Sequence, residues 1–202
     1  MEKTKNVELK ISLEKVIFAL VSIVEYGDPF TAVHQSQVTR LACEMAKEMN
    51  LPAEQITGLR IGGILHDIGK IRIPPEILLN LNPLNKVEMS MIRSHPQLGY
   101  DILTEVKFPW PVKQIVLQHH ERMDGSGYPK GLSGGKIILE AQIIAVADVM
   151  EAIVSERPYR PGLGLDKARE EISKNSGILY EPKAVDACLK LFNEKRFRFA
   201  AV

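Results

Sequence analysis

Residues 52–70, PAEQITGLRIGGILHDIGK, contain the pattern that decides the fold. Apolar residues and glycines recur at the three- and four-residue spacing of a helix, and His66 falls on the same face as Ile56 and Leu59. The glycine pair in the middle lets another backbone approach closely. The segment that starts at Asp67 contains a further glycine and ends the helix. We therefore expect a buried helix that presents a histidine, followed directly by an aspartate, at its C-terminal end.

The same periodicity continues over most of the chain. Turn signals separate the helical segments, among them Gly27-Asp28-Pro29 and the Pro74-Pro75 pair. No strand of convincing length, internal repeat or low-complexity tract interrupts the pattern. The expected helices are residues 10–26, a helix from Thr31 to about Met49, a helix from about Pro52 to His66, residues 76–79 and 86–93, a helix that starts at Pro96, and residues 112–119, 141–152, 166–174 and 183–195.

These helices predict an all-α fold, a single-domain helical bundle with a glycine-rich loop. The chain has 202 residues, which is enough to bury a core and close to the ~150 residues of a typical domain. Within it we expect three parts. Residues 1–27 form an N-terminal helix that acts as a linker, a dimer contact or a packing helix, residues 28–195 form the functional domain, and residues 196–202 form a tail.

The composition limits the expected binding partners and the expected cellular location of the protein. The formal net charge is +1 at pH 7, with 25% charged residues of both signs, so a long nucleic acid is not an expected partner. The two cysteines, Cys43 and Cys188, lie far apart in helical patterns, as core residues do in a reducing compartment. No apolar stretch reaches the ~20 residues of a membrane span. We therefore expect a cytoplasmic protein.

All five histidines lie at a helix end or on the apolar face of a helix. A single histidine in such a place is more often a hydrogen-bonded core residue than a metal ligand. Five of five, with two adjacent to each other and one next to an aspartate, favour a metal centre, because neutral imidazole is the commonest metal ligand. The five are His34, His66, His95, His119 and His120.

Asp148 supports the same interpretation. It stands between Ala145 and Ala152 in the middle of an apolar helix face. An unpaired carboxylate buried there would cost several kcal/mol, so it needs a cation or a dense set of hydrogen bonds. A metal ion meets that need.

The candidate ligands number seven, which exceeds a single octahedron. We therefore expect two divalent ions bridged by Asp67, as helix bundles build di-metal centres. Imidazole and carboxylate ligands without a thiolate favour iron or manganese, with zinc, nickel or cobalt as substitutes in vitro. The expected sets are His34, His66, Asp67 and Asp148 for one ion, and Asp67, His95, His119 and His120 for the other.

Several separate motifs, in order from about Asp28 to Leu191, resemble the HD-GYP domain of the HD superfamily of metal-dependent phosphohydrolases. A glycine-rich loop over residues 121–135 is one of them. The motifs are His66-Asp67-Ile68-Gly69-Lys70, His95-Pro96, His119-His120-Glu121, Asp124-Gly125-Ser126-Gly127-Tyr128-Pro129, Ala145-Val146-Ala147-Asp148 and Arg157-Pro158-Tyr159-Arg160.

The resemblance implies an HD-type bundle with an HD-GYP catalytic domain over residues 28–195. It also implies a bacterial phosphodiesterase that hydrolyses cyclic di-GMP to linear pGpG, GMP or both. In such a reaction a hydroxide activated by two metals attacks phosphorus in line with the leaving ribose oxygen. Some members hold a third metal through a glutamate four residues before the first histidine. Phe30 occupies that position, which favours two ions.

The resemblance also implies roles outside the ligand set. Asp67 and Lys70 are the catalytic candidates, and Lys70 is expected to face a phosphate, against the alternative of a solvated helix-end lysine. Tyr128 is a guanine contact or a cap of the loop, and the arginines are phosphate contacts or surface ion pairs. Glu151 stands where the family usually has aspartate. The expected substrate contacts are Lys70, Tyr128, Glu151, Arg157 and Arg160, and the expected supports of the loop are Asp124, Gly125 and Gly127.

Two other functions stay open on the sequence. The same centre could hydrolyse another cyclic dinucleotide, such as cyclic GMP-AMP, or a nucleotide. Alternatively, the chain could be a catalytically silent signalling module that docks partners through the glycine loop. HD-GYP domains usually follow receiver or sensory domains, so the resemblance implies such partners, a GGDEF-type protein or a homodimer.

Overall fold

The computed structural model describes residues 29–80, 82–156 and 162–200, except for the side chains of residues 29–32. Within these ranges the protein consists of helices joined by turns and loops, and its extended contacts are two isolated bridges between single residues. This confirms the predicted all-α fold. The helix expected over residues 10–26 lies outside the described residues.

The elements follow each other with short connections. They are α2 (Pro29–Glu48), α3 (Ala53–Leu65), the 3-10 helix η2 (Ile68–Arg72), α4 (Pro75–Leu78), α5 (Lys86–Arg93), α6 (His95–Ile102), α7 (Val112–Gln118), the 3-10 helix η3 (Gly134–Lys136), α8 (Leu139–Val154), α9 (Leu165–Lys174) and α10 (Pro182–Asn193).

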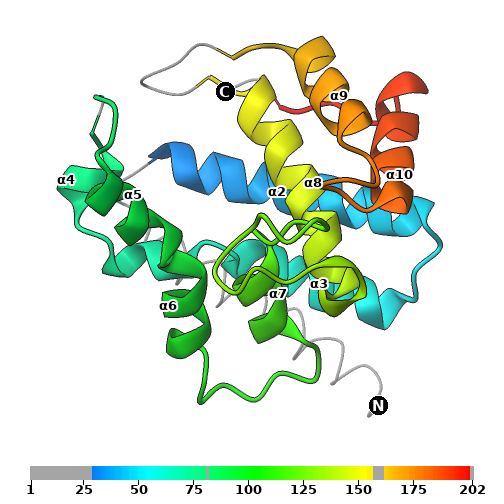
Figure 1. The fold of residues 1–202 in the computed structure, drawn as a ribbon. Helices are drawn as coiled ribbons and strands as arrows, with labels where there is room; N and C mark the ends of the chain where they lie inside the picture. The colour runs from blue at the N-terminus through cyan, green and yellow to red at the C-terminus, as the bar shows by residue number, and fades with distance from the viewer. Residues whose placement is uncertain (1–28, 81, 157–161, 201–202) are drawn as a thin grey trace.

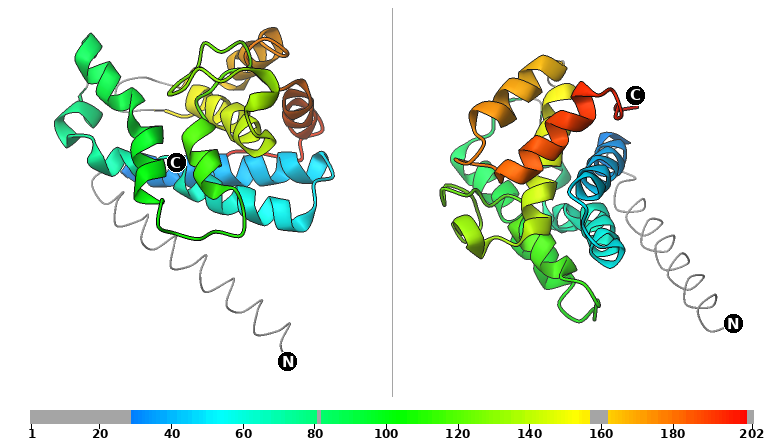
Figure 2. Two further views of the ribbon diagram at one scale, coloured as in Figure 1. Left: turned by 60° about the horizontal axis from the view of Figure 1, so that its bottom comes forward. Right: turned by 90° about the vertical axis from the view of Figure 1, so that its right-hand side faces the viewer.

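Helices α2 and α8 cross near the centre of the molecule (Figure 1). Helix α3 runs beside α2, and α9 and α10 pack with α8 on one side (Figures 1 and 2). Helices α4, α5 and α6 lie on the opposite side of the molecule from α9 and α10 (Figure 1). This arrangement brings the end of α3 close to the N-terminal half of α2, where His34 lies.

Two apolar cores hold the bundle. The larger joins α2, α8, α9 and α10 and includes Leu41, Ile144 and Cys188, all fully buried. Burial of a side chain such as leucine or isoleucine contributes roughly 1.5–3 kcal/mol. The smaller core joins α3, α6 and α7 through residues such as Ile61 and Val116. It packs α3 against α7, the two helices that His66 and His119 directly follow. Both cysteines are free and buried, as the sequence predicts.

Gly69 lets η2 lie directly against α6. A Cβ atom at Gly69 would lie 2.0 Å from the carbonyl oxygen of His95 and 2.5 Å from the backbone nitrogen of Gly99, so no side chain fits there. Because the two backbones approach so closely, Asp67 at the start of η2 comes next to His95. A local property of one glycine thus joins two of the predicted ligands.

The helix boundaries differ from the predictions by one or two residues. Helix α2 begins at Pro29 and not at Thr31, since proline suits the first turn of a helix. Helix α6 begins at His95 and not at Pro96. In the described part of the chain, no helix combines the length and the apolarity needed to cross a membrane.

Candidate metal centre

The structure brings the seven predicted ligands together from five segments of the chain. His34 lies on α2 and Asp148 on α8. His66 and Asp67 connect α3 to η2, His95 begins α6, and His119 and His120 directly follow α7. Five of the seven are buried, His120 and Asp148 only partly so. The centre is therefore an interior site with one accessible side.

The ligand atoms form two clusters that share Asp67. In each cluster, one potential ligand atom from every residue lies within 4.8 Å of the others. We call the first the imidazole cluster; it consists of Asp67, His95, His119 and His120. We call the second the His34 cluster; it consists of His34, His66 and Asp67. Asp148 adjoins the latter, with its Oδ1 3.1 Å from Nε2 of His34.

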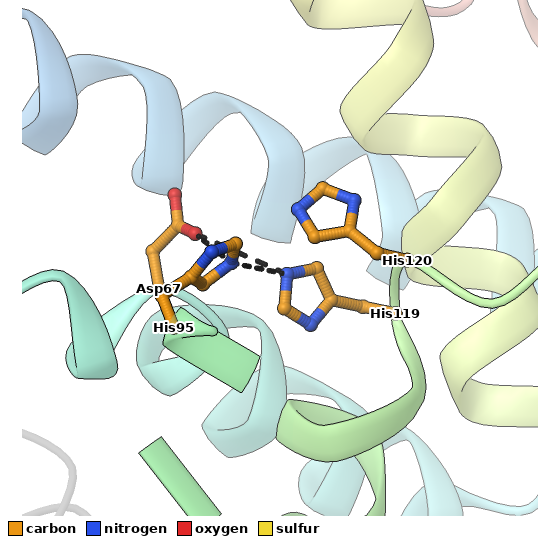
Figure 3. Close-up of side chains that lie close together, drawn as sticks. All are labelled: Asp67, His95, His119 and His120. Atoms are coloured by element: carbon orange, nitrogen blue, oxygen red, sulfur yellow. Dashed lines mark hydrogen bonds and ion pairs between the residues drawn. The ribbon is translucent and has the colours of Figure 1, made fainter. Parts of the chain in front are cut away.

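The side chains of the imidazole cluster converge on one point (Figure 3). Nε2 of His95 lies 3.1 Å from Oδ1 of Asp67 and 3.2 Å from Nε2 of His119. The rings of His119 and His120 are tilted against each other with centroids 4.1 Å apart. Two ligands bound at about 2.1 Å to one ion, at angles near 100°, lie roughly 3.2 Å apart. These spacings are those of ligands to a common metal.

Backbone carbonyls orient three of the histidines. Nδ1 of His66, His95 and His119 each lies 2.7 Å from the carbonyl oxygen three residues earlier, in the last turn of a helix. Such a contact makes Nδ1 the protonated nitrogen, so a neutral ring presents an unprotonated Nε2 to the centre. The fixed tautomer is the one that a metal ligand requires.

The donor atoms inside the site fit a cation. Nε2 of His66 and Oδ1 of Asp67 are buried without a hydrogen-bond partner. The two Nε2 lone pairs of His95 and His119, 3.2 Å apart, repel each other unless a proton or a metal ion lies between them. The donor set, nitrogen and carboxylate oxygen without sulfur, is that of iron, manganese or zinc sites. The residues present therefore fit a divalent metal.

Burial and neighbouring histidines lower the pKa of His119 and His120. Burial lowers the pKa of His120 to about 3, and burial together with His120 and His66 holds the pKa of His119 well below its usual value. Burial alone would raise the pKa of Asp67, but Lys70 and His66 outweigh it and hold that pKa well below the ordinary range. At neutral pH His119 and His120 are therefore neutral imidazoles beside a charged carboxylate.

His34 has the opposite environment. Asp148 lies beside its Nε2, and a carboxylate oxygen of Glu151 accepts a hydrogen bond from its Nδ1. Burial by itself lowers the pKa of His34, but the hydrogen bonds to Asp148 and Glu151 outweigh it and raise that pKa to about 9. In the absence of a metal, His34 is an imidazolium between two carboxylates.

Glu151 does not lie where the sequence prediction puts it. We expected a substrate contact, but the residue is 1% exposed and its carboxylate bonds to His34. Its extra methylene, compared with the aspartate usual at this position, lengthens the reach of the carboxylate. The difference is a correction: in the structure Glu151 contacts a predicted ligand from behind.

Lys70 and Tyr128 border the accessible side. Nζ of Lys70 donates to Oδ2 of Asp67 at 2.6 Å, and its side chain is 29% exposed. The ring of Tyr128 stacks on His120 with centroids 4.7 Å apart. The guanidinium of Arg93, which we did not single out in the sequence, lies 5.6 Å from the centroid of the Tyr128 ring. These residues form a polar rim beside the imidazole cluster.

The glycine loop is braced by two carboxylates. Oδ1 of Asp124 accepts hydrogen bonds from the backbone nitrogen and the hydroxyl of Ser126. Glu121, 2% exposed, accepts from the backbone nitrogens of Lys130 and Leu132. Glu121 belongs to the predicted His119-His120-Glu121 motif but had no predicted role, since a glutamate beside two histidines does not indicate which backbone it will meet.

Glycines shape the same loop. At Gly127 a Cβ would lie 2.4 Å from the backbone nitrogen of Arg122, so the loop closes onto the residues after His120 only with glycine there. Gly125 has a positive φ of 84°. Arg157 and Arg160, the predicted phosphate contacts, lie outside the described residues, as does the side chain of Phe30.

Comparison with known proteins identifies the family. The HD domain family model matches residues 19–184. The chain belongs to the HD domain family. Its relatives and motifs place it among the HD-GYP proteins. A cyclic di-GMP phosphodiesterase response regulator of Xanthomonas campestris pv. campestris is 39% identical over 173 residues, 85% of this chain and 46% of the relative.

Two other similarities extend the comparison. The 3'3'-cGAMP-specific phosphodiesterase 1 of Vibrio cholerae is 36% identical over 180 residues, 86% of this HD-GYP chain and 42% of the relative. A solved HDGYP protein of Bdellovibrio bacteriovorus superposes with a TM-score of 0.68 at 19% identity, over 95% of this chain and 66% of that chain, and supports the fold. The chain spans about half the length of the curated relatives it matches.

Proposed function

We propose that this HD-GYP domain is a phosphodiesterase that hydrolyses cyclic di-GMP to pGpG, GMP or both. The observation on which the proposal rests is the pair of buried ligand clusters that share Asp67. A shared carboxylate sets two ions a few ångströms apart, the arrangement used by many enzymes that cleave phosphate esters. The name of the Xanthomonas relative supports cyclic di-GMP as the substrate.

The proposed ligands are the seven predicted ones. His34, His66, Asp67 and Asp148 hold one ion, and Asp67, His95, His119 and His120 hold the other. When bound, two divalent ions, iron or manganese, supply positive charge to the phosphate oxygens and lower the pKa of a bound water. The chain's own contribution is orientation: the carbonyl contacts of His66, His95 and His119 fix each Nε2 before any ion arrives.

Lys70 is the proposed cation for the scissile phosphate. Its ammonium lies 2.6 Å from Asp67 and remains partly exposed at the accessible side. There it can hold Asp67 in place and also contact a non-bridging phosphate oxygen. Lys70 therefore couples the bridging carboxylate to the substrate.

The rim supplies the remaining substrate contacts. Tyr128 covers His120 with its ring, and we assign it to a guanine base, which can stack on an aromatic face. Arg93, beside that ring, adds a positive charge at the rim. Arg157 and Arg160 keep their proposed role as contacts of the second phosphate, because their planar donor groups match phosphate oxygens.

The decisive experiment is an assay of metal-loaded protein. The protein is purified without oxygen, loaded with Fe(II) or Mn(II), analysed for bound metal and given cyclic di-GMP. We expect two ions per chain and formation of pGpG or GMP, and loss of both in Asp67→Ala. Intact cyclic di-GMP in the presence of two bound ions would overturn the proposal.

A second candidate substrate is cyclic GMP-AMP, because the Vibrio relative is named for it. The two substrates differ in one base, so the distinction depends on rim residues and not on the metal ligands. Parallel kcat/KM measurements on both dinucleotides decide between them. A silent docking module is the remaining alternative, which an unchanged cellular phenotype in His66→Ala would support.

Residues 28–195 are the proposed catalytic domain, and residues 1–27 the proposed connection to a receiver or sensory domain, a GGDEF-type partner or a second copy. We propose a cytoplasmic location in a bacterium, where cyclic dinucleotides are produced.

A further inference from the structure

The way in which His34 is held differs from that of the other buried histidines. His66, His95 and His119 each place Nδ1 on a backbone carbonyl three residues earlier. His34 instead places Nδ1 on the side chain of Glu151, 117 residues later in the chain. One histidine of the centre is thus oriented by a tertiary contact, whereas three are oriented by a backbone carbonyl three residues earlier.

The position of each histidine in its helix explains the difference. Carbonyls in the last turn of a helix have no partner within the helix, and the acceptors of His66, His95 and His119 belong to the last turns of α3, α5 and α7. His34 lies within α2, fourteen residues before its end, where backbone carbonyls already accept from the following turn. A ligand in the middle of a helix therefore needs an acceptor from elsewhere.

The burial and the hydrogen bonds of Glu151 suit it to be that acceptor. It is 1% exposed, and its second carboxylate oxygen accepts a hydrogen bond of 2.6 Å from the hydroxyl of Ser155. Asp148 lies one turn earlier on the same helix and faces the other nitrogen of His34 at 3.1 Å. Helix α8 thus contacts both ring nitrogens of His34 with carboxylates three residues apart.

We propose that Glu151 is a positioning residue that orients His34 so that its Nε2 and Asp148 together bind the ion of the His34 cluster. The inference rests on the proposed two-metal centre. It assigns Glu151 to the support of His34 in place of a contact with the substrate. Carboxylates bonded to a ligating histidine fix the ring and make its other nitrogen a stronger donor. Removing such a partner weakens metal binding roughly 10- to 100-fold.

The test measures metal binding without substrate. Glu151→Ala and Glu151→Gln are made in the full chain, stripped of metal and titrated with Co(II), whose visible spectrum reports the ligands, and with Mn(II). We expect Glu151→Ala to bind one of its two ions roughly 10- to 100-fold more weakly and to lose the corresponding part of the Co(II) spectrum. Glu151→Gln keeps an acceptor of the same size without the charge and should fall between Glu151→Ala and the wild type.

Glu140→Ala is the matched control. Glu140 is also a poorly exposed carboxylate of α8, but it accepts from Gln55 at 2.9 Å and touches none of the proposed ligands. We expect two ions with wild-type affinity in this variant. Two ions at wild-type affinity and an unchanged Co(II) spectrum in Glu151→Ala, or in Glu151→Gln if the alanine variant does not fold, would overturn the positioning role.

The outcome is separable from that of the proposed function. If the wild type binds two ions but leaves cyclic dinucleotides intact, only the proposed phosphodiesterase is wrong, and the titrations still test Glu151. If the wild type is active and Glu151→Ala keeps both ions and their spectrum, only the positioning role is wrong.

Discussion

The imidazole cluster and His34 are both buried, but the pKa values of His119 and His120 shift in the opposite direction to that of His34. In the imidazole cluster, three rings surround one carboxylate, and burial holds the pKa of His119 and His120 below the usual value. His34 has two carboxylates for one ring, and its pKa rises to about 9. Without a metal, His34 binds a proton at neutral pH, whereas His119 and His120 do not. We therefore expect the two halves of the proposed di-metal centre to respond differently when metal is removed.

Asp67 belongs to both regions, so its loss should have the largest effect. Asp67→Ala removes the shared ligand and the partner of Lys70. Loss of a residue that only supports a ligand lowers metal affinity roughly 10- to 100-fold. Asp67 is itself a proposed ligand, so we expect larger losses of affinity for both ions and no measurable turnover. Metal analysis after dialysis checks this. Retention of one tightly bound ion would show that the clusters do not share Asp67.

Removing one histidine from each region should lower the free energy of unfolding by different amounts. In metal-free protein, His34→Ala leaves Asp148 and Glu151 without their cation, and breaking a buried charge pair costs about 3–5 kcal/mol. His119→Ala removes a lone pair that faces His95 at 3.2 Å, so part of its packing loss is offset and the cost should be smaller. Urea unfolding in the presence of a chelator measures both. Equal losses would contradict the contrast between the two regions.

The pH dependence of the metal-free protein follows from His34. Its pKa is about 9 in the folded state against an ordinary value of 6.5, so the folded state binds the proton more tightly. This stabilisation is fully present below pH 6.5 and is lost as the pH rises through about 9, an effect of up to about 3 kcal/mol. Unfolding free energies from pH 6 to 10, with a chelator, test it. The matched control is His34→Ala, whose profile should be flatter over this range.

The imidazole cluster should show the opposite trend in acid. The pKa of His120 is about 3 in the folded state, so the unfolded chain binds its proton more readily below pH 6.5. His120 therefore contributes a loss of stability as the pH falls from 6.5 towards 3. The same titration in His120→Gln isolates this contribution from that of the carboxylates. A profile identical to that of the wild type would contradict it.

Gly69→Ala should disturb the imidazole cluster more than the contacts of His34 and have the smallest effect on stability. The added Cβ would meet the carbonyl of His95 at 2.0 Å, so η2 and α6 must move apart, at a cost of about 1–3 kcal/mol. That movement separates Asp67 from His95 and should weaken the ion there, while the contacts of His34 with α8 remain. Co(II) titration shows which spectrum changes. Gly135→Ala is the control, since nothing lies within 4 Å of its Cβ position.

Most of the fold was predictable because helical periodicity is a local property of the chain. The residues 86–93 became α5 with the expected bounds, and the Asp148 stripe became α8. The candidate ligands were predictable for the same reason: a histidine or aspartate on an apolar face needs a partner inside the protein. Boundaries moved by one or two residues where proline or a capping residue competed with the apolar pattern.

The sequence by itself determined the helices, the ligand types and the turn glycines, all of which depend on neighbours within a few residues. Only the tertiary structure decided which atoms meet. Glu151 was expected at the substrate, but the crossing of α2 and α8 places its carboxylate behind His34. Glu121 likewise meets the loop backbone, and Tyr128 meets His120. A side chain's partner depends on how distant helices pack, and one methylene is enough to change it, which no spacing along the chain can specify.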